Sequence, residues 1–128
     1  MKRIEFGFRS LKNGQYRTVE KESLMLTGDE NIVDAEMIVQ YKIKDPVKYL
    51  FNIVEPELTV REAAEASLRT VVGRNKIDET LTTGKFTIQE ETKEQVQSIL
   101  DKYESGIHIV AVQLQDVSPP KEVIGAFK

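Results

Sequence analysis

The chain has 128 residues, of which 30% are charged and 40% hydrophobic, so one globular domain with a buried core is expected rather than a disordered chain. It contains no cysteine, which excludes disulfides, thiolate metal sites and cysteine nucleophiles. No apolar run approaches the ~20 residues of a membrane span. The net charge of −3 is uneven, because residues 1–21 carry +4 and the remainder −7. A basic end fits an anionic lipid surface or, more simply, a solvated strand rim. The sequence lacks the basic stripe interleaved with aromatic residues that would indicate a nucleic-acid partner.

The first 30 residues predict two strands and two turns. Apolar and polar residues alternate over residues 3–9, which predicts a first strand with an aromatic inner face. Asn13-Gly14 predicts a tight turn, because both residue types tolerate positive φ. Residues 22–27 predict a second strand. Residues 28–31 then turn the chain back, so that this strand forms a hairpin with the sequence that follows.

The stretch from Asn31 to Asp45 predicts one long strand around which the other elements can be arranged. Its odd-numbered positions from Val33 to Ile43 are apolar, whereas its even-numbered positions are mostly polar. Successive side chains of a strand point to opposite faces, so the odd face is expected to be buried and the even face wet. Pro46 ends the strand because proline cannot donate to a β-ladder.

Helical patterns follow. Residues 46–53 predict a short helix, since Val47, Leu50 and Phe51 recur at helical spacing behind a proline. Residues 56–74 predict a longer helix, and residues 77–81 a single turn. The longer helix has small alanines that would allow close packing, an apolar stripe (Val60, Ala64, Leu68, Val71 and Val72) and mostly outward charges (Arg61, Glu62, Glu65 and Arg69).

The last third of the chain predicts a helix, a strand and an exit. Thr87 and Glu90 have the spacing of a capping box, which predicts that a helix starts there and runs to about Glu104, with Gly106 after its C-cap. Its inward residues are expected to be Ile88, Val96, Ile99, Leu100 and Tyr103. Residues 107–117 predict a strand, Ser118-Pro119-Pro120 ends it, and residues 121–127 start an exit helix. The order predicts an α+β fold, a mixed or antiparallel sheet with helices packed on one side.

Three side chains are candidates for chemistry. Asp34 and Glu36 lie two residues apart on the same strand face, where paired carboxylates can act as general acid and base or hold a divalent cation. That face is expected to be wet, so neither pKa should approach neutrality and solvated carboxylates are favoured. His108 is the single histidine, with no second histidine, HExxH motif or nucleophile elbow beside it. We therefore predict no catalytic, cofactor-binding or metal-binding residues and no enzymatic activity.

Several segments together resemble the SPFH domain family, also called the band 7 or prohibitin-homology family. The resemblance covers about residues 22–127 in the family's order and spacing, whereas the first 21 residues match only loosely. The wording LTxDENIV followed by VQYxIxDPxKYLF is similar to the HflK branch more than to stomatin or prohibitin. The matching segments are 24–27, 29–33, 39–43, 45–46, 48–51, 61–63, 72–74, 81–82, 106–107, 114–117 and 119–123.

The resemblance implies one SPFH domain over residues 1–128, excised from a longer protein with an N-terminal transmembrane helix and a C-terminal coiled coil. Residues 121–128 would then start the exit helix. It also implies a non-catalytic membrane scaffold that assembles with an HflC-like paralogue into large rings and regulates the membrane AAA+ protease FtsH, without a cofactor. The expected location is the bacterial cell membrane, with the domain on the periplasmic side. The coiled coil is missing here, which leaves a monomeric state open for the isolated chain. The alternative is a stomatin-like or flotillin-like organiser that acts on lipid or on a different protease.

Overall fold

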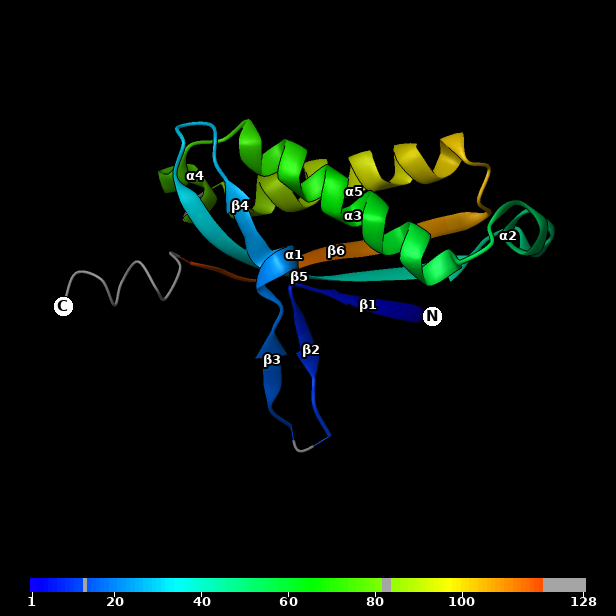
Figure 1. Cartoon of the computed structure of the whole chain (residues 1–128). Helices are drawn as coiled ribbons and strands as arrows, with labels where there is room; N and C mark the ends of the chain where they lie inside the picture. The colour runs from blue at the N-terminus through cyan, green and yellow to red at the C-terminus, as the bar shows by residue number, and fades with distance from the viewer. Residues whose placement is uncertain (13, 82–83, 119–128) are drawn as a thin grey trace.

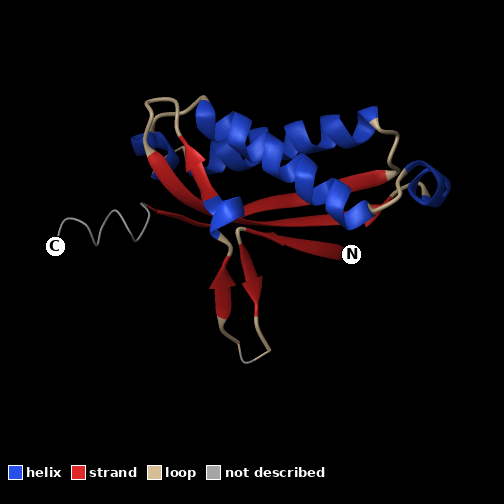
Figure 2. Ribbon diagram, viewed as in Figure 1, coloured by secondary structure: helices blue, strands red, loops and turns tan. Residues whose placement is uncertain are grey.

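The computed structural model describes residues 1–12, 14–81 and 84–118, which form a layer of helices on one face of a β-sheet (Figures 1 and 2). The sheet contains β1 (Lys2–Phe6), β4 (Leu24–Leu26), β5 (Ile32–Ile43) and β6 (Ile107–Ser118), and every pairing is antiparallel. Two long helices, α3 (Pro56–Gly73) and α5 (Lys85–Lys102), cover one face. The predicted α+β architecture is confirmed.

β5 is the central strand, as the alternating pattern predicted. Its odd-numbered residues from Val33 to Tyr41 are fully buried against the helices, because alternation sends them all to one face. β6 pairs with one edge of β5 along most of its length. The other edge is shared, since β4 lies opposite Ile32–Asp34 and β1 lies opposite Met37–Tyr41.

A hairpin leaves the sheet between β1 and β4, and this corrects the prediction of one strand over residues 3–9. β1 ends at Phe6, and β2 (Phe8–Ser10) pairs instead with β3 (Tyr16–Thr18) in a separate two-stranded sheet. The break lies at Gly7, which has a φ of +85°, a conformation that side chains with a Cβ rarely adopt. The hairpin projects from the sheet on the side opposite to α3 and α5 (Figure 1). Asn13, at its predicted turn, lies outside the described residues.

The chain returns to the sheet through a helical turn, where the sequence predicted strand. α1 (Glu20–Ser23) occupies the start of the predicted strand over residues 22–27, so only β4 remains of it. β4 still forms the predicted hairpin with β5, with Met25 opposite Val33. The turn is helical because Glu22 N and Ser23 N both donate to the carbonyl of Val19, at 3.0 and 3.1 Å.

The short and middle helices lie where the sequence predicted them. α2 (Pro46–Asn52) is capped by the Asp45 carboxylate, which accepts from the backbone N–H of Val47 at 3.1 Å and of Lys48 at 3.2 Å. The predicted apolar stripe of α3 is buried, and α4 (Ile77–Leu81) is the predicted single turn. Within the described residues, no helix has the combination of length and apolar character that a membrane crossing needs.

α5 begins earlier than predicted, so the capping box of Thr87 and Glu90 is wrong. Gly84 is the N-cap, because its N–H bonds to Glu79 O at 2.9 Å and its carbonyl accepts the first helical bond from Ile88. Thr87 therefore lies inside the first turn. At the other end Tyr103 is the C-cap and is exposed rather than inward. Positive φ occurs at Glu104 (+49°) as well as at Gly106 (+70°). β6 follows as predicted, while the predicted stop at Pro119-Pro120 and the exit helix lie outside the described residues.

Side chains of the two long helices close the free edges of the sheet. On the β6 edge, Gln97 of α5 accepts from Ile109 N at 2.8 Å and donates to Ile107 O at 3.0 Å, as a neighbouring strand would. Gln89 accepts from Leu114 N at 2.7 Å. On the opposite edge, arginines of α3 donate to the carbonyls of Glu5 and Leu24. Edge backbone groups that would otherwise need water or another chain thus have partners.

Candidate functional site

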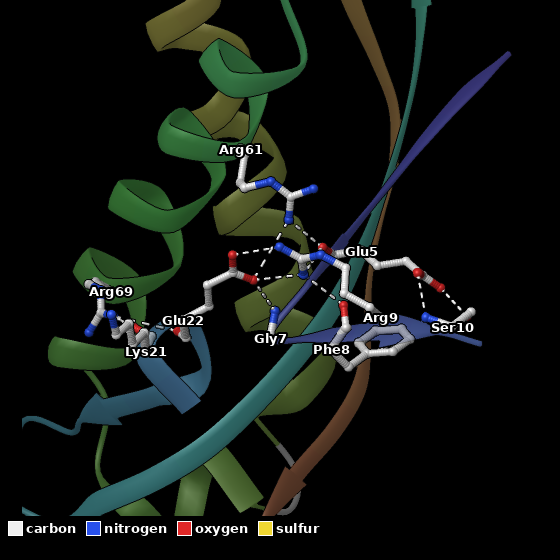
Figure 3. A network of polar contacts seen from close by, with 9 residues as sticks. All are labelled: Glu5, Gly7, Phe8, Arg9, Ser10, Lys21, Glu22, Arg61 and Arg69. Carbon is white, nitrogen blue, oxygen red and sulfur yellow. Dashed lines mark hydrogen bonds and ion pairs between the residues drawn. The ribbon is translucent and has the colours of Figure 1, made fainter. Parts of the chain in front are cut away.

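A network of polar contacts lies where the hairpin leaves the sheet, and Glu22 is at its centre (Figure 3). The Glu22 carboxylate accepts from Gly7 N at 2.8 Å and, in bidentate fashion, from Arg9 Nη1 at 2.9 Å and Nη2 at 2.7 Å. Arg61 Nη1, from α3, lies 3.7 Å from the same carboxylate. Arg61 is distant in sequence from Gly7, Arg9 and Glu22. The network therefore links both ends of the hairpin segment to the helix layer.

Glu5 extends this network along β1. Its backbone carbonyl accepts from Arg9 Nη1 at 3.0 Å and from Arg61 Nη1 at 2.6 Å. Its carboxylate accepts from Ser10 N at 2.8 Å, from the Ser10 hydroxyl, and from Arg3 Nη2 at 2.9 Å. The second half of β2 is thereby bound to the end of β1 by side chains, although the two strands belong to different sheets.

The electrostatics of the network favour the charged forms of Glu5, Arg9 and Glu22. Burial raises the pKa of Glu22, but the hydrogen bonds from Arg9 and Gly7 and the charges of Arg9 and Arg61 outweigh it, so the pKa is lowered. The same balance lowers the pKa of Glu5, where burial is outweighed by Ser10 and Arg3. The hydrogen bonds that Arg9 donates to the Glu22 carboxylate raise the pKa of Arg9. A general acid or base needs a pKa near the working pH, whereas these three groups stay ionised and link secondary-structure elements.

Arg69 performs the same task two helical turns further along α3. It donates to Leu24 O at 3.0 Å and to Lys21 O at 3.2 Å, and it pairs with Glu65 at 3.2 Å. Arg61 and Arg69 therefore hold the two ends of the segment that is inserted between β1 and β4. The prediction that both arginines point mostly outward is corrected, since their side chains are only 25% and 39% exposed.

The structure does not bring the three sequence candidates together. Asp34 is half-buried and His108 is exposed beside Lys42. Glu36 is buried, which corrects the expected wet face, because the backbone at Gly7 crosses β5 at this point and a Cβ there would lie 3.4 Å from Glu36 Cα. The strand position opposite His108 is Lys42, six positions along β5 from Glu36, which is about 20 Å along a strand. In the part of the chain that the structure describes, no group of three acidic, histidine or cysteine side chains could hold a metal ion.

Only part of this network could be predicted from the sequence. Arg61 and Arg69 are eight residues apart, so they share one face of α3, and that spacing was a visible signal. The pairing of Arg9 with Glu22 was not visible, because it depends on the chain breaking at Gly7 and on the turn of α1. Those two features bring the residues together across a hairpin whose existence the alternating pattern of residues 3–9 conceals.

A profile of the SPFH domain / Band 7 family matches residues 9–128, and the chain belongs to that family. Its sequence is similar to that of HflK proteins, with 40% identity over 111 residues to protein HflK of Buchnera aphidicola and 37% over 111 residues to an Escherichia coli protein named modulator of FtsH protease HflK. Protein HflK of Borreliella burgdorferi is 36% identical over 128 residues.

These matches cover most of this chain but a minor part of the relatives. The Buchnera and E. coli alignments each cover 87% of this chain, against 27% and 26% of the relatives, and the Borreliella alignment covers 98% of this chain and 41% of the relative. The chain thus spans well under half the length of the curated relatives it matches. The resemblance to the HflK branch, which the sequence motifs indicated, is confirmed.

Proposed function

We propose that this chain is the SPFH domain of a non-catalytic membrane scaffold that modulates the AAA+ protease FtsH. The observation that carries the proposal is the 37% identity to the E. coli protein named as an FtsH modulator, over 87% of this chain. The network around Glu22 supports a scaffold role, because its hydrogen bonds and ion pairs hold secondary-structure elements together. The pKa values of Glu5, Glu22 and Arg9 are also shifted away from neutrality.

The wider assembly is part of the same proposal. The parent protein has an N-terminal transmembrane helix and a C-terminal coiled coil, and it assembles with an HflC-like paralogue into large rings in the bacterial cell membrane. The domain lies on the periplasmic side. Two observations support this arrangement: the relatives are two to four times longer than this chain, and residues 8–18 carry three basic side chains and no acidic one. A projecting basic hairpin suits a position close to anionic lipid headgroups.

The test uses the full-length parent, extracted gently from its own membranes with whatever accompanies it. Co-elution of an HflC-like paralogue and FtsH in one very large particle is the expected result. A particle that lacks FtsH but contains another protease or a defined lipid would replace this proposal with the stomatin-like or flotillin-like organiser. A parent protein that is monomeric in native extracts would overturn the scaffold function itself.

A further inference from the structure

The first half of β1 is a stretch of sheet edge with outward-facing backbone groups. Among the described residues β1 pairs with β5 alone, and it forms the margin of the sheet near the N-terminus (Figure 1). In an antiparallel ladder, alternate residues direct their N–H and C=O groups toward the partner strand, and the residues between them direct theirs away. Glu5 directs its carbonyl away from β5, because that oxygen accepts from Arg9 and Arg61. Arg3, two residues earlier, therefore directs its N–H and C=O outward as well.

This stretch differs from the other edges of the sheet. Gln97 bonds to outward groups of β6, and Arg69 bonds to a carbonyl of β4. On β1 the Glu5 carbonyl is occupied in the same way. In the part of the chain that the structure describes, however, no group bonds to Arg3 N, Arg3 O or Glu5 N. Unpaired edge groups of this kind are a template onto which an extended peptide can add a strand.

Open space lies beside this edge, between β1 and the first turns of α3. A hollow of about 470 Å³ is lined by Arg3 on the strand side and by Arg61 on the helix side. Arg61 also lines a second hollow of about 590 Å³, which extends to Lys2. Arg61 reaches the Glu5 carbonyl at 2.6 Å (Figure 3), so its side chain closes the edge at that point. The room for an added strand thus lies along residues 2–4.

We propose that the first half of β1 binds an extended segment of another polypeptide by strand addition, with an acidic side chain of that segment across from Arg3. The backbone of the segment would bond to the N–H and carbonyl of Arg3 and to the N–H of Glu5. The Arg3 side chain is 51% exposed, and opposite charges directly across a strand pair are favourable. Nearer the helix layer the segment would meet Lys2 and Glu57, whose charges are opposite, so side chains there are less restricted.

A second copy of this chain fits this edge less well than an acidic segment. Antiparallel pairing of Arg3 with Arg3 would place like charges directly across from each other, which destabilises a strand pair. Pairing of Arg3 with Glu5 would match the charges. It would also need the Glu5 carbonyl, which already accepts from Arg9 at 3.0 Å and from Arg61 at 2.6 Å. The inference does not depend on the modulation of FtsH, and its test uses this chain alone, so the two proposals can fail separately.

Hydrogen exchange followed by NMR tests the strand addition. The probe is a blocked heptapeptide with a central glutamate between alternating valine and threonine residues, titrated to about 1 mM because short added strands bind weakly. Exchange of the Arg3 and Glu5 amides should slow. Exchange of the Ile4 amide, which points toward β5, and of the Ile109 amide, which bonds to Gln97, should stay unchanged.

The same peptide with every backbone nitrogen methylated keeps its side chains but has no backbone donor. It should bind at least about ten-fold more weakly, because strand addition depends on backbone hydrogen bonds. Unchanged exchange at Arg3 with the first peptide, or equal binding of the methylated one, would overturn the proposal. Slower exchange at Arg3 that follows protein concentration without any peptide would overturn it in favour of a second copy.

Charge reversal tests the position across from Arg3. The wild type should bind the glutamate peptide about two- to five-fold more tightly than the same peptide with a central lysine, and Arg3→Glu should invert this preference. Arg17→Glu is the matched control, since it removes an exposed arginine from β3, which belongs to the other sheet. It should keep the wild-type preference. The same preference in Arg3→Glu as in Arg17→Glu would contradict the placement of an acidic side chain across from Arg3.

Discussion

Replacing Glu22 by glutamine should destabilise the fold, because it removes the charge at the centre of the network between the hairpin, β1 and α3 while keeping the size of the side chain. The glutamine oxygen can still accept from Gly7 N and from one nitrogen of Arg9. One of the two bonds to Arg9 and the attraction of Arg61 at 3.7 Å are lost. Hydrogen bonds to charged groups contribute about 1.5–3 kcal/mol each.

The expected loss is about 2 kcal/mol in the free energy of unfolding, since Glu22 and Arg9 are only 16% and 31% exposed and water screens their attraction incompletely. For a domain of this size such a loss lowers Tm by roughly 6–10 °C. Glu65→Gln is the matched control. It removes the same charge from an i,i+4 pair on α3 whose members are 39% and 38% exposed, and such pairs contribute about 0.3–0.5 kcal/mol.

The pH dependence gives an independent check. The pKa of folded Glu22 lies below its ordinary value of 4.5, so its contribution to stability is fully present above that value and is lost as the pH falls through the folded pKa. The free energies of unfolding of the wild type and Glu22→Gln, measured in urea, should therefore differ by a constant amount from about pH 6 to about pH 8. That difference should shrink as the pH falls below the ordinary value of 4.5. A loss no larger than that of Glu65→Gln, or a difference that grows toward acid, would refute the reasoning.

Three further substitutions have expected outcomes. Gly7→Ala should lower the free energy of unfolding in urea by about 3 kcal/mol, and Gly14→Ala by about 1 kcal/mol. Both glycines have φ above +80°, but a Cβ at Gly7 would lie 2.8 Å from Ala35 O, while a Cβ at Gly14 would meet nothing within 4 Å. Equal losses would show that the close approach is unimportant. Gln97→Ala should lower the free energy of unfolding by about 1–2 kcal/mol and accelerate hydrogen exchange of the Ile109 amide. The control Gln113→Ala, at an exposed position, should change the free energy of unfolding by less than about 0.5 kcal/mol. Unchanged exchange at Ile109 would contradict the role of Gln97 at the sheet edge. Under the proposed function, the combination of Asp34→Asn, Glu36→Gln and His108→Ala should leave the proposed modulation of FtsH unchanged in a proteolysis assay. Loss of that modulation with the fold intact would indicate a chemical role for these residues.

Elements whose burial follows from their own periodicity could be predicted from the sequence. β5 and α3 lie where alternation and helical spacing placed them, because each buries one face against a single layer. β6 lies where its high β-branched content placed it. The resemblance to the SPFH family agreed with this fold and identified the HflK branch. Local turn chemistry was less informative. The spacing of Thr87 and Glu90 matched a capping box, yet α5 starts at Lys85 because the turn from α4 closes at Gly84.

Features that depend on two distant segments could not be predicted. Alternation over residues 3–9 continues through Gly7, but the chain breaks there because β4 continues the same edge of β5 and β1 must stop. Glu36 has the sequence context of a solvated residue and is buried by that crossing. The spacing of Val47, Leu50 and Phe51 correctly indicated the helix α2, but spacing alone does not say which way an apolar stripe faces. Contacts of Tyr49 and Asn52 decide this.

The way α5 closes the edge of β6 links local unfolding to aggregation. Gln89 and Gln97 occupy backbone groups that another β-strand would otherwise bind, and the same helix covers the core with Ile88, Val96 and Leu100. If α5 detaches, a long strand rich in β-branched residues becomes available for strand addition at the same moment as the core is exposed. Partial unfolding of this domain should thus lead directly to β-rich aggregates, and any partner that holds α5 in place would protect the protein from them.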